Sequence, residues 1–150
     1  MRHPLAVLPL LILAGCAASG PPAPPLEATL TMTEPDFEEK GGILPIVGTL
    51  TVTVAPDGAA ESICRRQIFT DVERRGDLSN AERWELHNKV DAWVARAGED
   101  PASSGPPYGV LTYGTHKATW SKGASLSPEL RELVQYLKTL TLSLNVVRRR

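Results

Sequence analysis

The feature that most restricts the fold is an order of elements that occurs twice, in which segments with strand periodicity precede a helix with a serine cap. Apolar and polar residues alternate, or turn residues set off short apolar runs, over 27–33, 49–55, 60–70, 108–113 and 116–121. The helices begin after Ser79 and Ser127. Runs of strands followed by a helix are typical of an antiparallel sheet with helices on one face. The sequence therefore predicts an α+β fold, one antiparallel sheet of about five strands packed on two helices.

The first helix is predicted over 80–97. Ser79 stands three residues before Glu82, the capping-box spacing, and Gly98 favours termination. At 100° per residue the apolar residues form one stripe that we expect in the core. Its members are Leu86, Val90, Trp93, Val94 and Ala97.

Trp84 falls nearly opposite this stripe, on the same side of the helix as Asn88. Two interpretations remain open for such a tryptophan. Either the acidic segment 34–42 covers it, or it faces a protein partner, since tryptophan is enriched at binding hot spots. Trp84 and Asn88 are therefore a candidate partner surface.

The second helix has Ser127 as its cap, Pro128 at the first position and Glu129 in the first turn. Its predicted core stripe is Leu130, Leu133, Val134, Leu137 and Leu140. Beyond Thr139, leucines alternate with small polar residues, so a closing strand is an alternative to more helix there. Residues 148–150 are expected to be a solvated basic tail.

The first sixteen residues are typical of a secretion signal. Arg2 precedes an apolar run over 5–13 that is too short for a spanning helix. The run ends at Leu13-Ala14-Gly15-Cys16, which resembles a bacterial lipobox. That resemblance implies cleavage after residue 15 and lipidation of Cys16 through its sulfur, with palmitate expected among the acyl chains. It also implies a membrane-anchored lipoprotein of the cell envelope that faces the periplasm or the exterior.

Residues 16–26 are predicted to be the lipidated cysteine and a proline-rich tether. Residues 17–26 contain four prolines and no charge, a composition that favours extended polyproline conformation. At ~3.1 Å per residue this tether spans up to about 30 Å, which suggests a spacer between lipid and domain. Residues 27–147 are then a single domain.

Charge and cysteine content narrow the function classes. Beyond residue 15 the chain carries 15 basic and 17 acidic side chains, so it lacks the basic footprint of a nucleic-acid-binding protein. Cys64 is the only cysteine besides Cys16, which leaves no intramolecular disulfide once Cys16 is lipidated. We expect Cys64 to be a small buried side chain; a reactive thiol or an intermolecular disulfide is the alternative.

No motif for catalysis or metal binding is evident. His87 and Asp91 are four residues apart on one predicted helix, close enough to interact, but two ligands do not make a zinc site. Cys64 with His87 or His116 is an open alternative, because a nucleophile and its base meet only in the fold. We therefore expect no enzyme activity, no metal and no cofactor.

The order of elements also resembles the emfourin family, small bacterial inhibitors of thermolysin-type metallopeptidases. The resemblance covers about residues 28–140 and uses Gly41-Gly42, the leucine-rich helix, the hairpin bearing Tyr108 and the helix that opens Ser127-Pro128-Glu129-Leu130. The acidic insert 34–40 and the lipid anchor depart from the family, and no inhibitory residue is assigned. The sequence thus favours a lipid-anchored, non-catalytic binding or scaffolding domain, with peptidase inhibition as the alternative.

Overall fold

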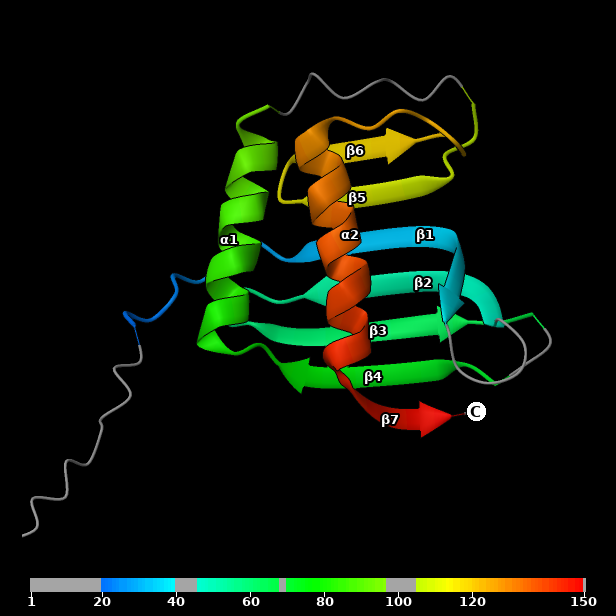
Figure 1. Ribbon diagram of the computed structural model, residues 1–150, viewed down its shortest axis with the longest axis horizontal. Coiled ribbons are helices and arrows are strands. Elements are labelled where there is room, and N and C mark those ends of the chain that lie inside the picture. Colours follow the sequence, from blue (N-terminus) through cyan, green and yellow to red (C-terminus); the bar gives the residue numbers. More distant parts are fainter. Residues whose placement is uncertain (1–19, 40–45, 68–69, 97–104, 150) are drawn as a thin grey trace, which may run out of the picture.

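A computed structural model describes residues 20–39, 46–67, 70–96 and 105–149. Seven described strands form one antiparallel sheet in the order β6-β5-β1-β2-β3-β4-β7 (Figure 1). They are β1 (Leu30–Glu39), β2 (Ile46–Val54), β3 (Ala59–Arg65), β4 (Val72–Asp77), β5 (Gly109–Tyr113), β6 (His116–Trp120) and β7 (Asn145–Arg149). The helices are α1 (Asn80–Val94) and α2 (Pro128–Ser143). The α+β prediction with two helices is confirmed, but the expected number of about five strands is wrong.

The two strands that the prediction lacks are β4 and β7. β4 reads Val-Glu-Arg-Arg-Gly-Asp and has no apolar alternation, so only its pairing with β3 and β7 reveals it as a strand. β7 includes Arg148 and Arg149, which the sequence assigns to a solvated tail. The closing strand starts later than the leucine alternation suggests, because residues up to Ser143 stay helical with Leu140 in the core.

β1 also runs further than its sequence indicates. The acidic, proline-containing stretch after Thr33 belongs to the strand, with a break in register between Glu34 and Phe37. Asp36 adopts a left-handed backbone conformation there, with φ of 57°. Aspartate tolerates that conformation better than most side chains, and the irregularity lets pairing with β2 resume.

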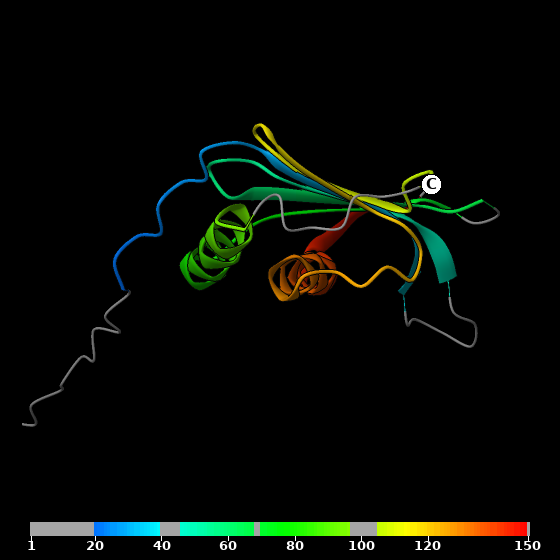
Figure 2. The same ribbon diagram turned by 90° about the horizontal axis from the view of Figure 1, so that it is seen from above.

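Both helices lie on the same side of the sheet (Figure 2). α1 carries the predicted capping box between Ser79 and Glu82, and α2 carries the predicted Ser127 cap. All five residues of the second helix's predicted stripe are buried, as are Leu86, Val90 and Trp93 of the first, which confirms both core faces. Val94 packs at the margin of the core, and Ala97 lies outside the described residues.

The strands alternate between two environments because successive side chains point to opposite sides of a sheet. On the helix side, Leu50, Val52 and Val54 of β2 are buried. On the opposite side, which we call the open face, Thr51 and Thr53 remain partly exposed. Within the described part of the chain, neither helix lies over the open face (Figure 2).

The N-terminal segment contacts the domain before β1 begins. Ala23 and Leu26 are only 5% and 8% exposed, and Leu26 donates its backbone N–H to the carbonyl of Pro56. Pro21–Leu26 therefore packs on the domain, contrary to our expectation that all of 17–26 stands off as a spacer. The four prolines of this segment have no N–H, so few hydrogen bonds are needed to pair its backbone with the domain. Composition alone does not reveal whether distant residues supply those partners.

Candidate functional site

The residues that the sequence singles out do not gather in one place. Cys16 lies outside the described residues. Trp84 and Asn88 lie on the outer side of α1, with Trp84 partly buried and Asn88 exposed. The Trp84 indole donates to the carbonyl of Pro21 at 2.9 Å. Trp84 is thus partly covered by its own chain, through a segment that neither sequence interpretation included.

The candidates for catalysis are placed apart from a common centre. Cys64 is 1% exposed within the hydrophobic core, as the small-buried-residue interpretation expects. His87 Nδ1 lies 3.0 Å from Asp91 Oδ2 on the outer surface of α1, which confirms that the carboxylate orients the ring. His116 belongs to β6 and its ring packs edge-on against Trp93, with centroids 6.3 Å apart. These contacts thus place Cys64 in the core and give each histidine a different neighbour.

Two searches of the described residues gave negative results. No group of three or more His, Cys, Asp and Glu side chains in this part of the chain is arranged to hold a metal ion. Neither α1 nor α2 combines the length and the apolar character that a bilayer-spanning helix requires.

The open face is a surface of the sheet that neither described helix covers (Figure 2). Threonines of four strands project from it: Thr31, Thr33, Thr49, Thr51, Thr53, Thr112 and Thr119. The hydroxyls of Thr33 and Thr51 lie 3.3 Å apart across β1 and β2. Threonine combines strand propensity with a donor and an acceptor, so this face offers hydrogen-bonding groups on a rigid scaffold.

A hollow of about 450 Å³ lies at the end of the open face where β2, β3 and β4 meet. Small residues make room for it, and its lining is Thr53, Ala55, Ala59, Ala60, Glu61, Arg75, Gly76 and Asp77. We call this the Arg75 hollow. Its lining comes from the end of β2, the start of β3 and the end of β4.

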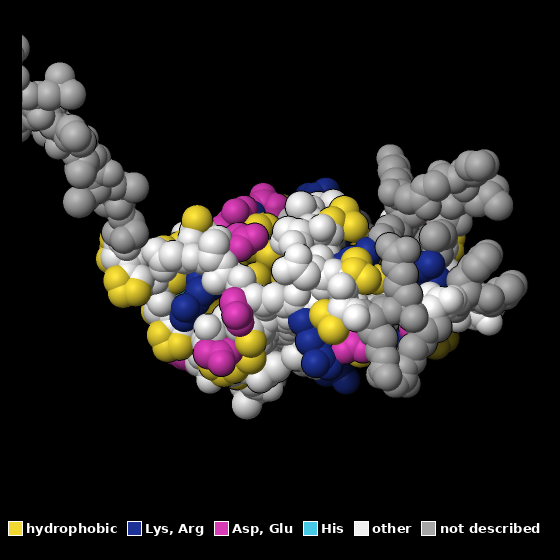
Figure 3. Space-filling view, turned by 90° about the horizontal axis from the view of Figure 1, so that it is seen from below, with side chains coloured by type: hydrophobic (Ala, Val, Ile, Leu, Met, Phe, Trp, Pro, Cys, Tyr) yellow, Lys and Arg dark blue, Asp and Glu magenta, His cyan; other side chains and the backbone are white. Residues whose placement is uncertain are grey.

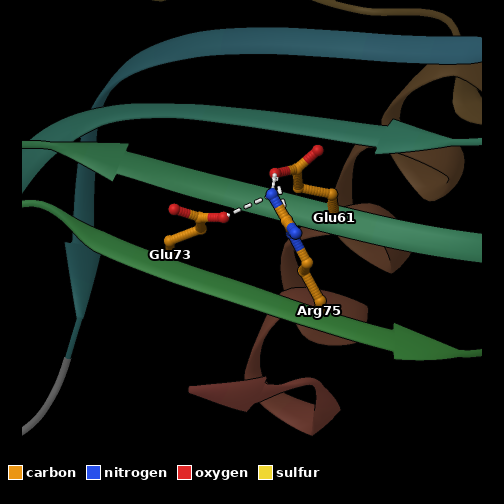
Figure 4. A network of polar contacts seen from close by, with 3 residues as sticks. All are labelled: Glu61, Glu73 and Arg75. Atoms are coloured by element: carbon orange, nitrogen blue, oxygen red, sulfur yellow. Dashed lines mark hydrogen bonds and ion pairs between the residues drawn. The ribbon is translucent and has the colours of Figure 1, made fainter. Parts of the chain in front are cut away.

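Arg75 is held between two carboxylates at this hollow (Figure 4). Glu61 of β3 lies directly opposite Arg75 of β4, and its Oε1 accepts from Nη2 at 3.0 Å and from Nε at 3.2 Å. Glu73, two residues earlier on β4, lies 2.7 Å from Nη2. In Figure 4 the helices are behind the strands, so the three side chains project from the open face.

The two carboxylates fix both the charge and the direction of the guanidinium. The hydrogen bond that Arg75 donates to Glu61, followed by the negative charges of Glu61 and Glu73, raises the pKa of Arg75 above its ordinary value. The Arg75 side chain nonetheless remains 59% exposed and accessible to a ligand. With Asp77 nearby, carboxylates outnumber the cation, so the hollow is acidic overall.

A second concave site lies where α2 passes the irregular part of β1. This groove of about 350 Å³ is lined by Asp36, Phe37, Glu38, Gln135, Lys138, Thr139 and Leu142. Beside it, Glu34 is 7% exposed and forms an ion pair with Lys138 of α2. Because a buried carboxylate is costly without a cation, this pair fixes β1 to α2 and has a structural role.

The irregular part of β1 next to this groove is held by Tyr108, just before β5, and by Lys122, in the loop after β6. Lys122 Nζ lies 2.9 Å from Asp36 Oδ2, which lowers the pKa of Asp36 through a hydrogen bond and charge attraction. The Tyr108 hydroxyl donates to the carbonyl of Pro35, and burial is the first cause that raises the pKa of Tyr108. Seen from the β7 edge, charged side chains of both signs are interspersed with hydrophobic ones on the described part of the surface (Figure 3).

Sequence reasoning missed the Arg75 hollow because its residues belong to separate strands. The only local signal is the spacing of Glu73 and Arg75, which places both on one face of a strand. That signal is useful only once β4 is recognised as a strand. Glu61 lies beside Arg75 only because of the register in which β3 pairs with β4.

Comparisons of the chain with models of protein families, with curated proteins and with solved structures gave no match.

Proposed function

We propose that this chain is a non-catalytic binding domain, anchored by a lipid on Cys16 in the bacterial cell envelope, that binds a protein partner through its open face. The observation that carries the proposal is the one-sided sheet. Seven strands present a polar, hydrogen-bonding face that no described helix covers, with a hollow at Arg75.

The chemistry of the hollow favours a basic partner segment. Glu61 and Glu73 hold one guanidinium and Asp77 also lines the hollow, so a Lys or Arg side chain of a partner would find more carboxylate than cation. Complementary charge of this kind mainly sets specificity and association rate. The threonines beside it supply neutral hydrogen bonds, which suit an extended polypeptide.

The environments of the candidate nucleophile and base support a binding role. Cys64 is buried in the core, where a substrate does not reach it. The imidazole of His87 is already oriented by Asp91 on an outer helix surface. Each of these residues therefore serves the packing or the surface of the domain.

Anchoring is tested by Cys16→Ser. Each acyl CH₂ buried in a membrane contributes ~0.8 kcal/mol, so two or more chains hold a protein stably on a bilayer. We expect Cys16→Ser to move the protein from the membrane fraction to the soluble fraction and to stop its labelling by palmitate. A variant that still sediments with membranes and is processed normally would contradict the anchor.

Binding is tested by cross-linking and pull-down from solubilised envelope with matched variants. Glu61→Gln with Glu73→Gln removes negative charge without changing side-chain size, and we expect it to weaken capture of a basic partner about tenfold or more. Asn88→Ala on α1 is the control and should capture the partner as before. The reverse result would place the interface on α1, where the sequence predicts a partner surface.

Titrating this protein against a thermolysin-type metallopeptidase distinguishes the emfourin-like alternative, peptidase inhibition, from the binding role proposed above. Stoichiometric inhibition would replace the scaffolding role with an inhibitory one. Gly41-Gly42, part of the resemblance to that family, lies outside the described residues.

A further inference from the structure

Between Pro21 and Glu27, every backbone N–H is paired with a group of the domain. Between Pro21 and Glu27 the four prolines have no N–H, so only Ala23, Leu26 and Glu27 carry a donor. Ala23 donates to Asn80 Oδ1 at 2.6 Å, Leu26 to the Pro56 carbonyl at 3.1 Å, and Glu27 to the Tyr113 hydroxyl at 2.9 Å. Full pairing of a segment outside the sheet indicates a built site.

Two side chains of α1, Asn80 and Trp84, bind the Pro21 end of the segment. The Pro21 carbonyl accepts from Asn80 Nδ2 at 3.0 Å and from Trp84 Nε1 at 2.9 Å. Asn80 therefore uses both its oxygen and its nitrogen on the same segment, donating to Pro21 and accepting from Ala23. This contact spans 59 residues of sequence at Pro21 and fixes the direction of the chain as well as its position.

Apolar packing completes the contact. Ala23 and Leu26 are buried, and only about 10 Å³ of space remains in the cavity that Pro24 and Leu26 share with Leu86 and its neighbours. That volume is about one water molecule or less, so the segment fills the site. Pro21 itself is exposed, which leaves the Trp84 end accessible from solvent.

These contacts have the chemistry of polyproline recognition. Extended proline-rich chain has no internal hydrogen bonds, so its carbonyls are free to accept from donors such as an indole N–H beside an aromatic surface. We propose that the Asn80–Trp84 end of α1 is a binding site for proline-rich extended segments, and that the chain's own Pro21–Leu26 occupies it. Its ligand class is a segment of the Pro-Pro-Ala-Pro-Pro-Leu type.

Occupation of this site shortens the tether if Cys16 carries the anchor. With Pro21–Leu26 docked, only residues 17–20 separate the lipidated residue from the domain, a reach of about 12 Å at ~3.1 Å per residue. With the segment released, residues 17–26 reach about 30 Å. The site thus controls how closely the domain sits to the membrane, while the binding chemistry itself is independent of lipidation.

Hydrogen exchange at the amides of Ala23, Leu26 and Glu27 tests the docked state in the purified full chain. Asn80→Ala removes two bonds and should speed exchange at Ala23 about tenfold; Trp84→Phe keeps an aromatic ring, removes one bond and should give about fivefold or less. Asn88→Ala, another asparagine on α1, should leave all three amides unchanged. Unaltered exchange at Ala23 in Asn80→Ala would overturn the proposal, as would an equal acceleration at the amides of α2, which reports general unfolding.

A second experiment supplies the ligand in trans. In one full chain, residues 21–26 are replaced by Gly and Ser at equal length; the probe is a synthetic peptide of residues 20–28, followed through the Trp84 indole N–H resonance. Saturable binding in the millimolar range or tighter is expected for the substituted chain, and at least tenfold weaker binding for the unaltered chain, whose site is occupied. No binding by a substituted chain that remains folded, or equal binding by both chains, would overturn the proposal.

Discussion

The two faces of the sheet use the same strands for different purposes. On β2, Leu50, Val52 and Val54 are buried on the helix side, whereas the neighbouring threonines are partly exposed to solvent. Apolar burial, at roughly 25 cal/mol per Å², is therefore concentrated on one face. Because the side chains of the covered face supply the apolar packing, those of the open face are available for recognition.

The largest expected difference between the faces comes from shortening one apolar side chain on the covered face. Leu133 of α2 is 0% exposed, and Leu133→Ala should lower the free energy of unfolding by about 2–5 kcal/mol. Thr51→Ala on the open face is the matched change and should cost less than about 1 kcal/mol. Urea denaturation of both variants measures the contrast, and similar midpoints would show that the open face is also a packing surface.

The ion pair on the covered face should have a smaller but clear effect. Lys138→Met leaves the Glu34 carboxylate buried without its cation and should lower the free energy of unfolding by about 1–3 kcal/mol, less than for a fully buried pair because Lys138 is partly exposed. Adding Glu34→Gln should restore most of this loss. Lys122→Met, which breaks the exposed pair with Asp36, should lower the stability far less than Lys138→Met does. Equal losses in the two lysine variants would remove the distinction between buried and exposed pairs.

The contact of Tyr136 of α2 with Glu82 of α1 should make the protein less stable at high pH. Burial, followed by the negative charges of Glu85 and Glu82, raises the pKa of Tyr136 to about 12, and its hydroxyl donates to the Glu82 carbonyl. The folded state thus keeps the proton longer than the unfolded state, whose tyrosine pKa is about 10. This contribution is fully present below pH 10 and is lost as the pH rises from 10 towards 12.

Because Tyr136 is only partly buried, solvent screening limits the effect to about 1 kcal/mol. The measurement is the unfolding free energy of the wild-type protein and of Tyr136→Phe between pH 9 and 11.5. Phenylalanine cannot ionise, so the difference between the two curves should shrink as the pH rises. A constant difference would show that the tyrosine titrates alike in both states.

The smallest expected effect on stability belongs to the open face. Arg75→Ala breaks exposed ion pairs with Glu61 and Glu73, and such pairs contribute little. We expect the thermal and urea unfolding midpoints of Arg75→Ala to match those of the wild-type protein within the error of the measurement. A loss comparable to that of Leu133→Ala would mean that this group holds the sheet together.

The sequence by itself determined the parts of the fold that depend on local patterns. Ser79 with Glu82, and Ser127 with Pro128, define where α1 and α2 begin, because capping involves residues only three positions apart. The stripe of α2 is readable for the same reason, since helical spacing fixes which side chains share a face.

Tertiary structure alone decided which backbones pair and what docks on α1. β4 is a strand because β3 and β7 flank it, and Glu61 meets Arg75 because of their register. Trp84 meets Pro21 across 63 residues, although neither position carries a local signal for the other. Such contacts depend on how distant segments are brought together, and hydrophobic periodicity records only the direction in which each side chain points.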